Sequence, residues 1–239
     1  MSVIKKDTIQ RLINDVKQII KNPLTENGIY YIHDDVDMLK GYAMIVGPED
    51  TPYFGGFYFF KLSYPTDYPH SPPKVTYCTN GKNIRFNPNL YTCGKVCVSL
   101  LNTWNGDQWT SCQTISTVLL TLCTLLCSNP LLNEPGVSTS HPDIAIYNEV
   151  IEFVNLDIAV CDIIEKKKAI FMPFFDNFYP FIREEFNKNV NKMIAFAEQK
   201  NEHFEKKVVV MKTKMYSINI KIHYKNIIER LNELKVLLA

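Results

Sequence analysis

The stretch from residue 28 to residue 77 most constrains the fold, because four short segments rich in Tyr, Phe, Ile and Val follow one another there. Clusters of Gly, Pro and Asp separate these segments. Short apolar segments bounded by turn residues are typical of strands, and short connections favour antiparallel pairing. We therefore predict an antiparallel meander with strands at Ile29–His33, Lys40–Val46, Phe57–Leu62 and Val75–Tyr77.

A helix is predicted ahead of the strands, over residues 7–22. Apolar residues recur there at helical spacing and form a single stripe. Asp7 stands where it can cap the helix, with Gln10 as its capping-box partner, and Pro23 ends the pattern.

Helical patterns also follow the strands. Residues 113–127 are apolar nearly all round, which predicts a buried helix. Further helical patterns cover residues 142–168, 175–206 and 225–238, and a run of three valines at 208–210 precedes the last of them.

These elements predict an α+β fold: an N-terminal helix, a four-stranded antiparallel meander, C-terminal helices and a helical C-terminal extension. A chain of 239 residues fits one domain plus such an extension. We predict a first domain over residues 1–155 and the extension over residues 156–239, packed on the first domain because its apolar stripes need burial.

Residues 78–111 carry little periodicity, although they lie inside the first domain. They are rich in Asn, Gly and Thr and hold both tryptophans. A loop of this length in a compact domain is usually functional or disordered. Its aromatic and aliphatic residues argue against disorder, so we expect an ordered functional loop.

Composition excludes some classes of partner. The chain has 26 basic and 25 acidic residues, a net charge of +1. This balance argues against bulk nucleic acid or an anionic membrane surface as a partner. No run of 18 apolar residues is present, so we expect no membrane-spanning segment.

The cysteines and the N-terminus bear on the compartment. The first residues carry charge and no apolar signal region follows them, so we do not expect secretion. Seven cysteines are an odd number, and without a secretory signal they are expected to be reduced thiols. We therefore expect a cytoplasmic or nuclear protein.

Motifs in the irregular region occur in a specific order. A Pro88-Asn89 turn lies eight residues before Cys97, and Trp109 and the buried helix follow. A Tyr-Pro, Tyr-Pro, Pro-Pro run at residues 64–73 comes before them. In this order, and with the predicted layout of helix and strands, the chain resembles the ubiquitin-conjugating enzymes over roughly residues 5–155.

A narrower resemblance concerns a branch of larger family members. The segment from Ser99 to Trp109 carries extra residues relative to small members. Together with Asn129-Pro130 and the run at residues 133–136, it is similar to the branch that includes the Z and BRUCE-type enzymes. Residues 147–162 share this likeness, so we expect the extension to belong to the same architecture.

The resemblance implies that Cys97 accepts ubiquitin or a ubiquitin-like modifier as a thioester from an ATP-driven activating enzyme and passes it to a lysine amine. A thiol suits this task, because it is both a good nucleophile and a good leaving group. The alternative is a buried structural cysteine, the usual state of free cysteines.

The other cysteines are expected to do less. Cys123, Cys127 and Cys161 stand at helical spacing in apolar surroundings and are expected in the core. Cys93 is a bystander in the loop or forms a redox pair with Cys97. Their spacing is not that of a zinc site, and we expect no metal or small cofactor.

The resemblance also implies roles for Asn89 and Glu134. Asn89 is the candidate stabiliser of the oxyanion that forms when an amine attacks the thioester; the alternative is a turn residue only. Glu134 is the candidate acid that orients or deprotonates the attacking lysine. Asn133 is an alternative candidate for that role. The other alternative is that Glu134 is simply a solvated acid in the loop. Ser99 stands where many members carry Asp.

Partner surfaces depart from the common pattern. His70, in the Tyr-Pro to Pro-Pro loop, and residues 110–112 weaken the expectation of ordinary docking to a RING ligase, which stays an open partner. Lys5, Lys6 and Arg11 are candidates for contact with the activating enzyme or are simply solvated.

Two rival functions remain. A binding module that keeps the fold without catalysis is expected to lack the cysteine, which is present here. A cysteine hydrolase needs a histidine base beside the thiol, and none of the five histidines falls in a motif next to Cys97.

Overall fold

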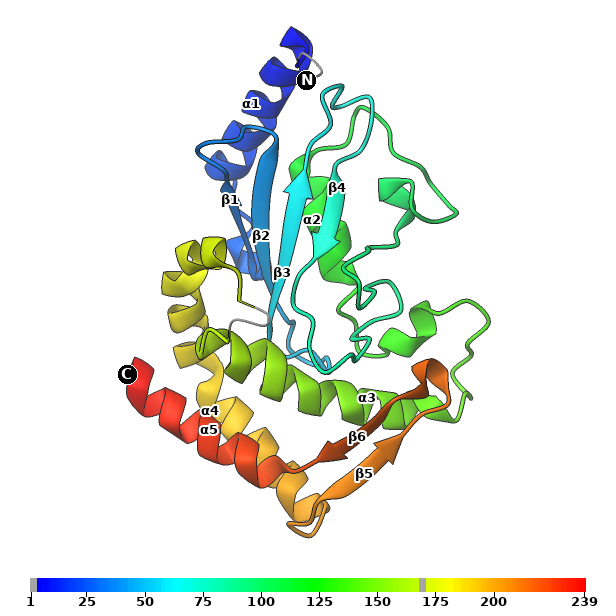
Figure 1. Cartoon of the computed structure of the whole chain (residues 1–239), viewed down its shortest axis with the longest axis vertical. Coiled ribbons are helices and arrows are strands. Elements are labelled where there is room, and N and C mark those ends of the chain that lie inside the picture. Colours follow the sequence, from blue (N-terminus) through cyan, green and yellow to red (C-terminus); the bar gives the residue numbers. More distant parts are fainter. Residues whose placement is uncertain (1–3, 168–170) are drawn as a thin grey trace.

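The computed structural model describes residues 4–167 and 171–239, and within them it has the predicted α+β architecture (Figure 1). The four strands form one antiparallel sheet in the order β1-β2-β3-β4, which confirms the predicted meander. The helices and strands are α1 (Lys6–Lys21), β1 (Ile29–His33), β2 (Lys40–Val46), β3 (Phe57–Ser63), β4 (Lys74–Tyr77), α2 (Ile115–Thr124), α3 (Asp143–Val154), α4 (Tyr179–His203), β5 (Val209–Lys212), β6 (Asn219–Ile222) and α5 (Tyr224–Leu238).

The strand register separates two faces of the sheet. Tyr30, Met44 and Phe59 lie opposite one another on neighbouring strands and therefore share one face. Ile45 and Tyr58, one residue along, face the other way. All five side chains are buried, so both faces of this sheet are covered.

One face is covered by α2 and the chain around it; α2 lies behind the sheet in Figure 1. Thr114 caps α2 through a reciprocal capping box with Thr117. The predicted buried helix is present, but Leu120 is exposed, so the helix buries one side rather than its whole surface.

The first helix begins one residue earlier than predicted. Lys5 is its N-cap residue, and no side chain caps it. Asp7 lies in the first turn, where its charge favours the helix dipole, so the predicted capping box with Gln10 was wrong.

Helix α3 continues without a break into a π-helical segment, Asn155–Asp162. The predicted boundary between residues 155 and 156 therefore falls inside a continuous helix, and the division into two domains stays a prediction. The predicted helix 142–168 ends at a residue that lies outside the described part of the chain.

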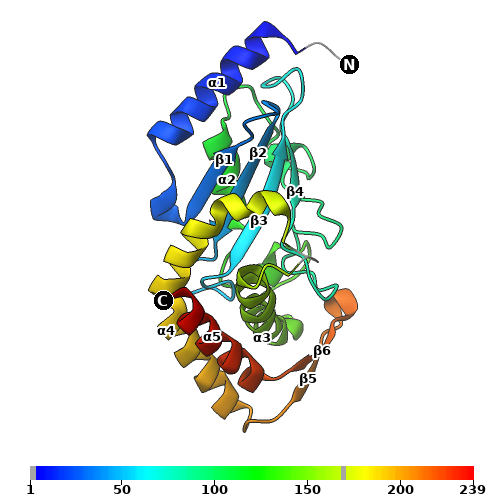
Figure 2. The same ribbon diagram turned by 60° about the vertical axis from the view of Figure 1, so that its left-hand side comes forward.

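The C-terminal extension covers the other face of the sheet with aromatic side chains. Phe175 stacks on Phe59 with ring centroids 4.0 Å apart, and Phe174 stacks on Tyr42 at 3.5 Å. Figure 2 shows the start of α4 crossing this face, and α4 and α5 run side by side.

A hairpin of β5 and β6 joins α4 to α5, whereas the sequence predicted only a short valine run there. Its strands are four residues each and are weakly apolar, which leaves little periodicity to detect. Within the described residues no helix is both long enough and apolar enough to cross a membrane.

Candidate functional site

Asn87 organises the turn ahead of the candidate cysteine. Its side-chain amide donates to the Tyr53 hydroxyl at 3.0 Å and to the Leu125 carbonyl at 2.7 Å. Its Oδ1 accepts the backbone N–H of Asn89 at 2.9 Å. The side chain is fully buried, and these three bonds fix the turn against α2 and the loop before β3.

Two hydrogen bonds join Asn89 to Cys97 across the eight-residue step. The Cys97 N–H donates to the Asn89 carbonyl at 2.9 Å. The Asn89 amide donates in return to the Cys97 carbonyl at 2.7 Å. The pair brings together the two residues that the sequence singled out, and it fixes the main chain on both sides of the sulfur. Asn89 Oδ1 is buried without a partner among the described residues.

The segment around Cys97 is held by further side-chain bonds. The Thr103 hydroxyl donates to the Val96 carbonyl at 2.9 Å and accepts the Val98 N–H at 3.0 Å. The sequence gave no signal for Thr103, because its role depends on a fold-back of the chain. Cys97 itself is only 2% exposed, so the cysteine is buried beneath the surrounding chain.

The extra residues of the loop fold back onto Ser99. A Cβ added to Gly106 would lie 3.1 Å from the Ser99 Cβ, and Gly106 has a φ of +127°. A glycine is needed at this close approach, because its backbone conformation disfavours any side chain. Ser99 therefore packs as a small residue beneath the loop, two residues from Cys97.

The remaining cysteines divide by exposure. Cys93 and Cys112 are exposed thiols, and all seven cysteines of the chain are free. Burial raises the pKa of Cys78 to about 11 and that of Cys161 to about 12. Burial also raises the pKa of Cys123, so Cys123 and Cys161 match the core role predicted for them.

Glu134 does not lie free in solvent. It follows the short turn Pro130–Asn133, and its half-buried carboxylate accepts a hydrogen bond from the Tyr216 hydroxyl. Burial, and next the bond to Glu134, raise the pKa of Tyr216. The neighbouring Asn133 has a buried Nδ2 atom without a partner among the described residues.

Arg85 connects this carboxylate to the loop that carries Asn89. Its guanidinium lies 3.7 Å from the ring centroid of Tyr91 and 4.5 Å from that of Tyr216. It also donates to the carbonyl of Pro88, next to Asn89. The sequence did not single out Arg85 or Tyr216, because 131 positions separate them and no local pattern links them.

The residues proposed for partner contact fall into two groups. His70, Lys5 and Lys6 are exposed. Arg11 is engaged within the chain: it pairs with Asp15 and donates to the carbonyls of Ser111 and Gln113. Its bonds tie α1 to the chain before α2, which is a structural task.

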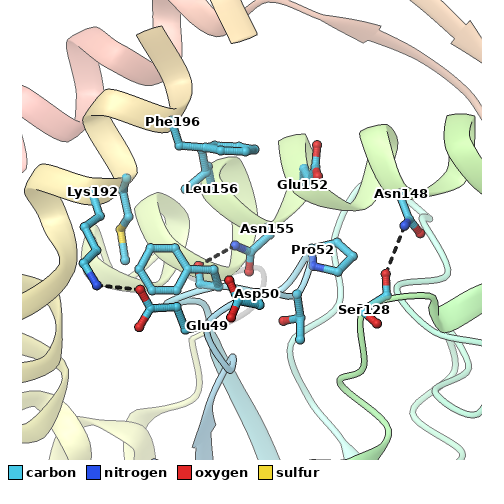
Figure 3. Close-up of a pocket in the computed structure, with 13 residues that line it drawn as sticks. Glu49, Asp50, Pro52, Ser128, Asn148, Glu152, Asn155, Leu156, Lys192 and Phe196 are labelled. Atoms are coloured by element: carbon cyan, nitrogen blue, oxygen red, sulfur yellow. Dashed lines mark hydrogen bonds and ion pairs between the residues drawn. The ribbon is translucent and has the colours of Figure 1, made fainter. Parts of the chain in front are cut away.

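A cavity of about 400 Å³ lies between α4 and the segment that precedes β3 (Figure 3). Its lining mixes apolar side chains such as Phe196 with polar ones such as Asn155 and Glu152. As far as the described residues go, no predicted site residue lines it. No group of three or more potential metal ligands gathers within residues 4–167 and 171–239.

The amino-acid sequence is similar to those of known proteins. Ubiquitin-conjugating enzyme E2 Z from Homo sapiens is 46% identical over 160 residues, which is 66% of this chain and 45% of that protein. The Xenopus tropicalis protein of the same name is 36% identical over 211 residues, 82% of this chain and 67% of that protein. The chain thus spans less than half the length of the human relative.

A third relative and a family model also match the chain. The human dual E2 ubiquitin-conjugating enzyme/E3 ubiquitin-protein ligase BIRC6 is 43% identical over 128 residues, 49% of this chain and 3% of that protein. A family model described as ubiquitin-conjugating enzyme matches residues 11–145. The resemblance drawn from the motifs is confirmed, and the chain belongs to the ubiquitin-conjugating enzyme family.

Proposed function

We propose that the chain accepts ubiquitin or a ubiquitin-like modifier on Cys97 and transfers it to a lysine amine of a protein substrate. The observation that carries this proposal is the reciprocal pairing of Cys97 with Asn89 inside an ordered loop. Family membership supplies the modifier and the activating enzyme as partner classes, with a ubiquitin ligase as a further partner.

The proposed chemistry has two steps. The Cys97 thiolate attacks the carbonyl carbon of the activating enzyme's thioester with the modifier, and the activating enzyme's cysteine leaves as a thiolate. A neutral lysine amine then attacks the new thioester, which gives a tetrahedral centre with a negative oxygen. Cys97 leaves as a thiolate, and the nitrogen loses its proton as the amide forms.

Two side chains are proposed to assist the second step. The Asn89 amide stabilises the developing oxyanion with the second N–H of its NH2 group, since the first donates to the Cys97 carbonyl. Glu134 orients the lysine ammonium and accepts its proton. Its half-buried position and its fixed partner Tyr216 support a placed carboxylate over a freely solvated one.

A charging assay tests the proposal. The full chain is incubated with ATP, several activating enzymes and several modifiers, and the products are separated on non-reducing gels. We expect a reductant-sensitive adduct in the wild type, a reductant-resistant oxyester in Cys97→Ser, and no adduct in Cys97→Ala.

Cys93→Ala is the matched control, because this exposed thiol lies in the same loop. It should charge as the wild type does. A reductant-sensitive adduct that persists in Cys97→Ala would show that another cysteine is the acceptor.

The second candidate function is a catalytically weak binding module. The burial of Cys97 favours it, because an acceptor must be reached by a bulky partner. Binding of modifier or activating enzyme without any adduct in the same assay would support it. We propose the cytoplasm or nucleus as the compartment, a proposal supported by seven free thiols.

A further inference from the structure

We propose that Tyr216 of the C-terminal extension is a positioning residue for the Glu134 carboxylate. The inference rests on the proposed function, in which Glu134 orients the attacking lysine. The Tyr216 hydroxyl donates to Oε2 of Glu134. Oε1 receives no hydrogen bond from the described residues, so one oxygen is held while the other stays open to an incoming ammonium.

The turn that carries Tyr216 is anchored to the start of α3. Asp143, at the start of α3 and only 6% exposed, accepts the backbone N–H groups of Lys214 at 2.9 Å and Met215 at 2.8 Å. Bonds from two consecutive amides to one buried carboxylate oxygen fix the turn in position. The anchored turn therefore holds the Tyr216 hydroxyl in a fixed position next to Glu134.

The backbone of Tyr216 is held in a costly conformation. Its φ is +58°, and that of Ser217 is +50°, so two consecutive residues other than glycine lie in the left-handed region. An aromatic residue adopts this region only where the surroundings hold it there, and such positions cluster at functional sites. Here the conformation directs the ring between Arg85 and Glu134.

The ring of Tyr216 also couples the carboxylate to the cysteine loop. The Arg85 guanidinium lies over this ring and also over the ring of Tyr91, and it donates to the Pro88 carbonyl. Tyr147 completes the contact, since its hydroxyl donates to the Arg85 carbonyl at 2.7 Å. Tyr216 thus contacts both Glu134 and Arg85, and Arg85 in turn holds the main chain next to Asn89.

The phenol keeps its proton throughout the working pH range, because burial and the bond to Glu134 raise its pKa. A neutral donor fixes the rotamer of Glu134 without cancelling its charge. Without the hydroxyl, the carboxylate samples other rotamers and meets the lysine less often. Hydrogen bonds to charged groups are the stronger kind, so a loss on the order of tenfold in lysine discharge is expected.

Tyr216→Phe tests the proposal, because it removes only the hydroxyl and keeps the ring on Arg85. The full chain is charged on Cys97, and discharge to free lysine is followed in single turnovers from pH 6 to pH 9. We expect unchanged charging, about tenfold slower discharge near pH 7, and a steeper gain with pH than in the wild type, since hydroxide replaces the placed base.

Tyr179→Phe is the matched control. Its hydroxyl also donates to a neighbour, the Ile164 carbonyl at 3.2 Å, but it lies on the α4 side of the extension. It should leave discharge and its pH profile unchanged. Thermal unfolding of both variants identifies any loss of discharge that arises from unfolding alone, and a purely structural role would not alter the pH profile.

Glu134→Gln separates the positioning role of Tyr216 from the role of Glu134 itself. It should slow discharge at least as much as Tyr216→Phe, and the double variant should be no slower than Glu134→Gln. Normal discharge in Tyr216→Phe beside slow discharge in Glu134→Gln overturns the positioning role alone. Faster discharge in Tyr216→Phe also overturns it, because the tyrosine would then restrain the acid. Normal discharge in both variants removes the role of Glu134 and the inference with it, and absence of any charging overturns the proposed function.

Discussion

The cysteine loop and the C-terminal extension are held by different forces. The loop is fixed by side-chain hydrogen bonds to the main chain, made by Asn87, Asn89 and Thr103. The extension is fixed by buried aromatic rings, with Phe175 and Phe178 both against Phe59. Apolar burial stabilises in proportion to area, whereas a net hydrogen bond contributes about 1 kcal/mol but sets geometry. The loop is therefore specialised for geometry and the extension for stability.

This difference predicts which substitutions unfold the protein and which alter its chemistry. Changes in the extension should lower the free energy of unfolding, with catalysis following. Changes in the loop should alter transfer rates with a smaller effect on stability. The hairpin of β5 and β6 is an exception within the extension, because its Tyr216 contacts Arg85, which holds the cysteine loop. Changes in this hairpin should therefore also alter transfer rates.

Phe175→Ala should have the largest effect. Phe175 is fully buried and stacks on Phe59, and large-to-small changes of this kind cost about 3–5 kcal/mol. Urea unfolding of the full chain measures the loss. Amide exchange across residues 175–206 should be slow in the wild type and faster in the variant.

Phe181→Ala is the control for that prediction, since Phe181 also stacks on the sheet, at Tyr30, but is 36% exposed. Its cost should be clearly smaller. Rapid exchange across residues 175–206 in the wild type would contradict burial of the extension against the sheet and indicate an arm that awaits a partner.

Asn89→Ala should have the next largest effect, and on chemistry. Loss of an oxyanion donor costs about 10²-fold or more in rate. Discharge to lysine should slow more than charging, because the amine is the weaker nucleophile. Single-turnover discharge of pre-charged enzyme measures it, with unfolding followed in parallel. Equal small effects on both steps would leave Asn89 as a turn residue only.

Arg230→Met should destabilise the extension by about 1–3 kcal/mol, since it leaves partly buried carboxylates without their partner. Arg230 of α5 pairs with Asp157, Asp162 and Glu165. Urea unfolding at pH 7 measures the change. Replacement of Lys188 is the control and should change stability less, because its ion pairs within the described residues join it to Glu184 and Glu185 of its own helix.

The same variant predicts a pH dependence. Burial alone would raise the pKa of Glu165, but the bonds and charges of Arg230 and Lys167 lower it overall. A lowered carboxylate pKa gives stability that is present above the ordinary value of 4.5 and is lost as pH falls through the folded value. The difference in free energy of unfolding between the wild type and Arg230→Met should therefore become smaller as the pH falls below about 4.5. A constant difference would show that Arg230 acts through packing.

Lys192→Ala should have the smallest effect. Lys192 of α4 pairs with Glu49, and the two side chains are 60% and 63% exposed (Figure 3). Exposed ion pairs contribute about 0–1 kcal/mol and are screened by salt. Unfolding at low and high salt checks this prediction. A loss above about 2 kcal/mol would mean that the cavity beside this pair depends on it.

The sequence predicted the strands well, because their signals are local. The strands are rich in Tyr, Phe, Ile and Val, and turn residues such as Gly47 bound them. The hairpin of β5 and β6 was missed for the opposite reason: its strands are short, and its turn at Tyr216 contains no glycine although φ is positive there. Tertiary contacts outweigh local preference at that turn.

The site divides in the same way. The spacing of Asn89 and Cys97 identified a pair that the structure joins by two hydrogen bonds, since a turn of fixed length brings them together. The assignment of Cys97, Asn89 and Glu134 as catalytic stays a prediction. The bond from Tyr216 to Glu134 was not predictable, because it links positions 82 residues apart.

What the sequence by itself determined is the order of elements, the family and the candidate cysteine, because apolar periodicity, turn residues and motif spacing are all local. What only the tertiary structure decided is which long-range contacts form. Phe175 covers Phe59, Arg85 contacts the rings of two tyrosines, and Tyr216 of the hairpin turn reaches Glu134. These contacts depend on how the C-terminal extension packs against the sheet and α3, and burial of apolar area selects that packing without leaving a local pattern in the chain.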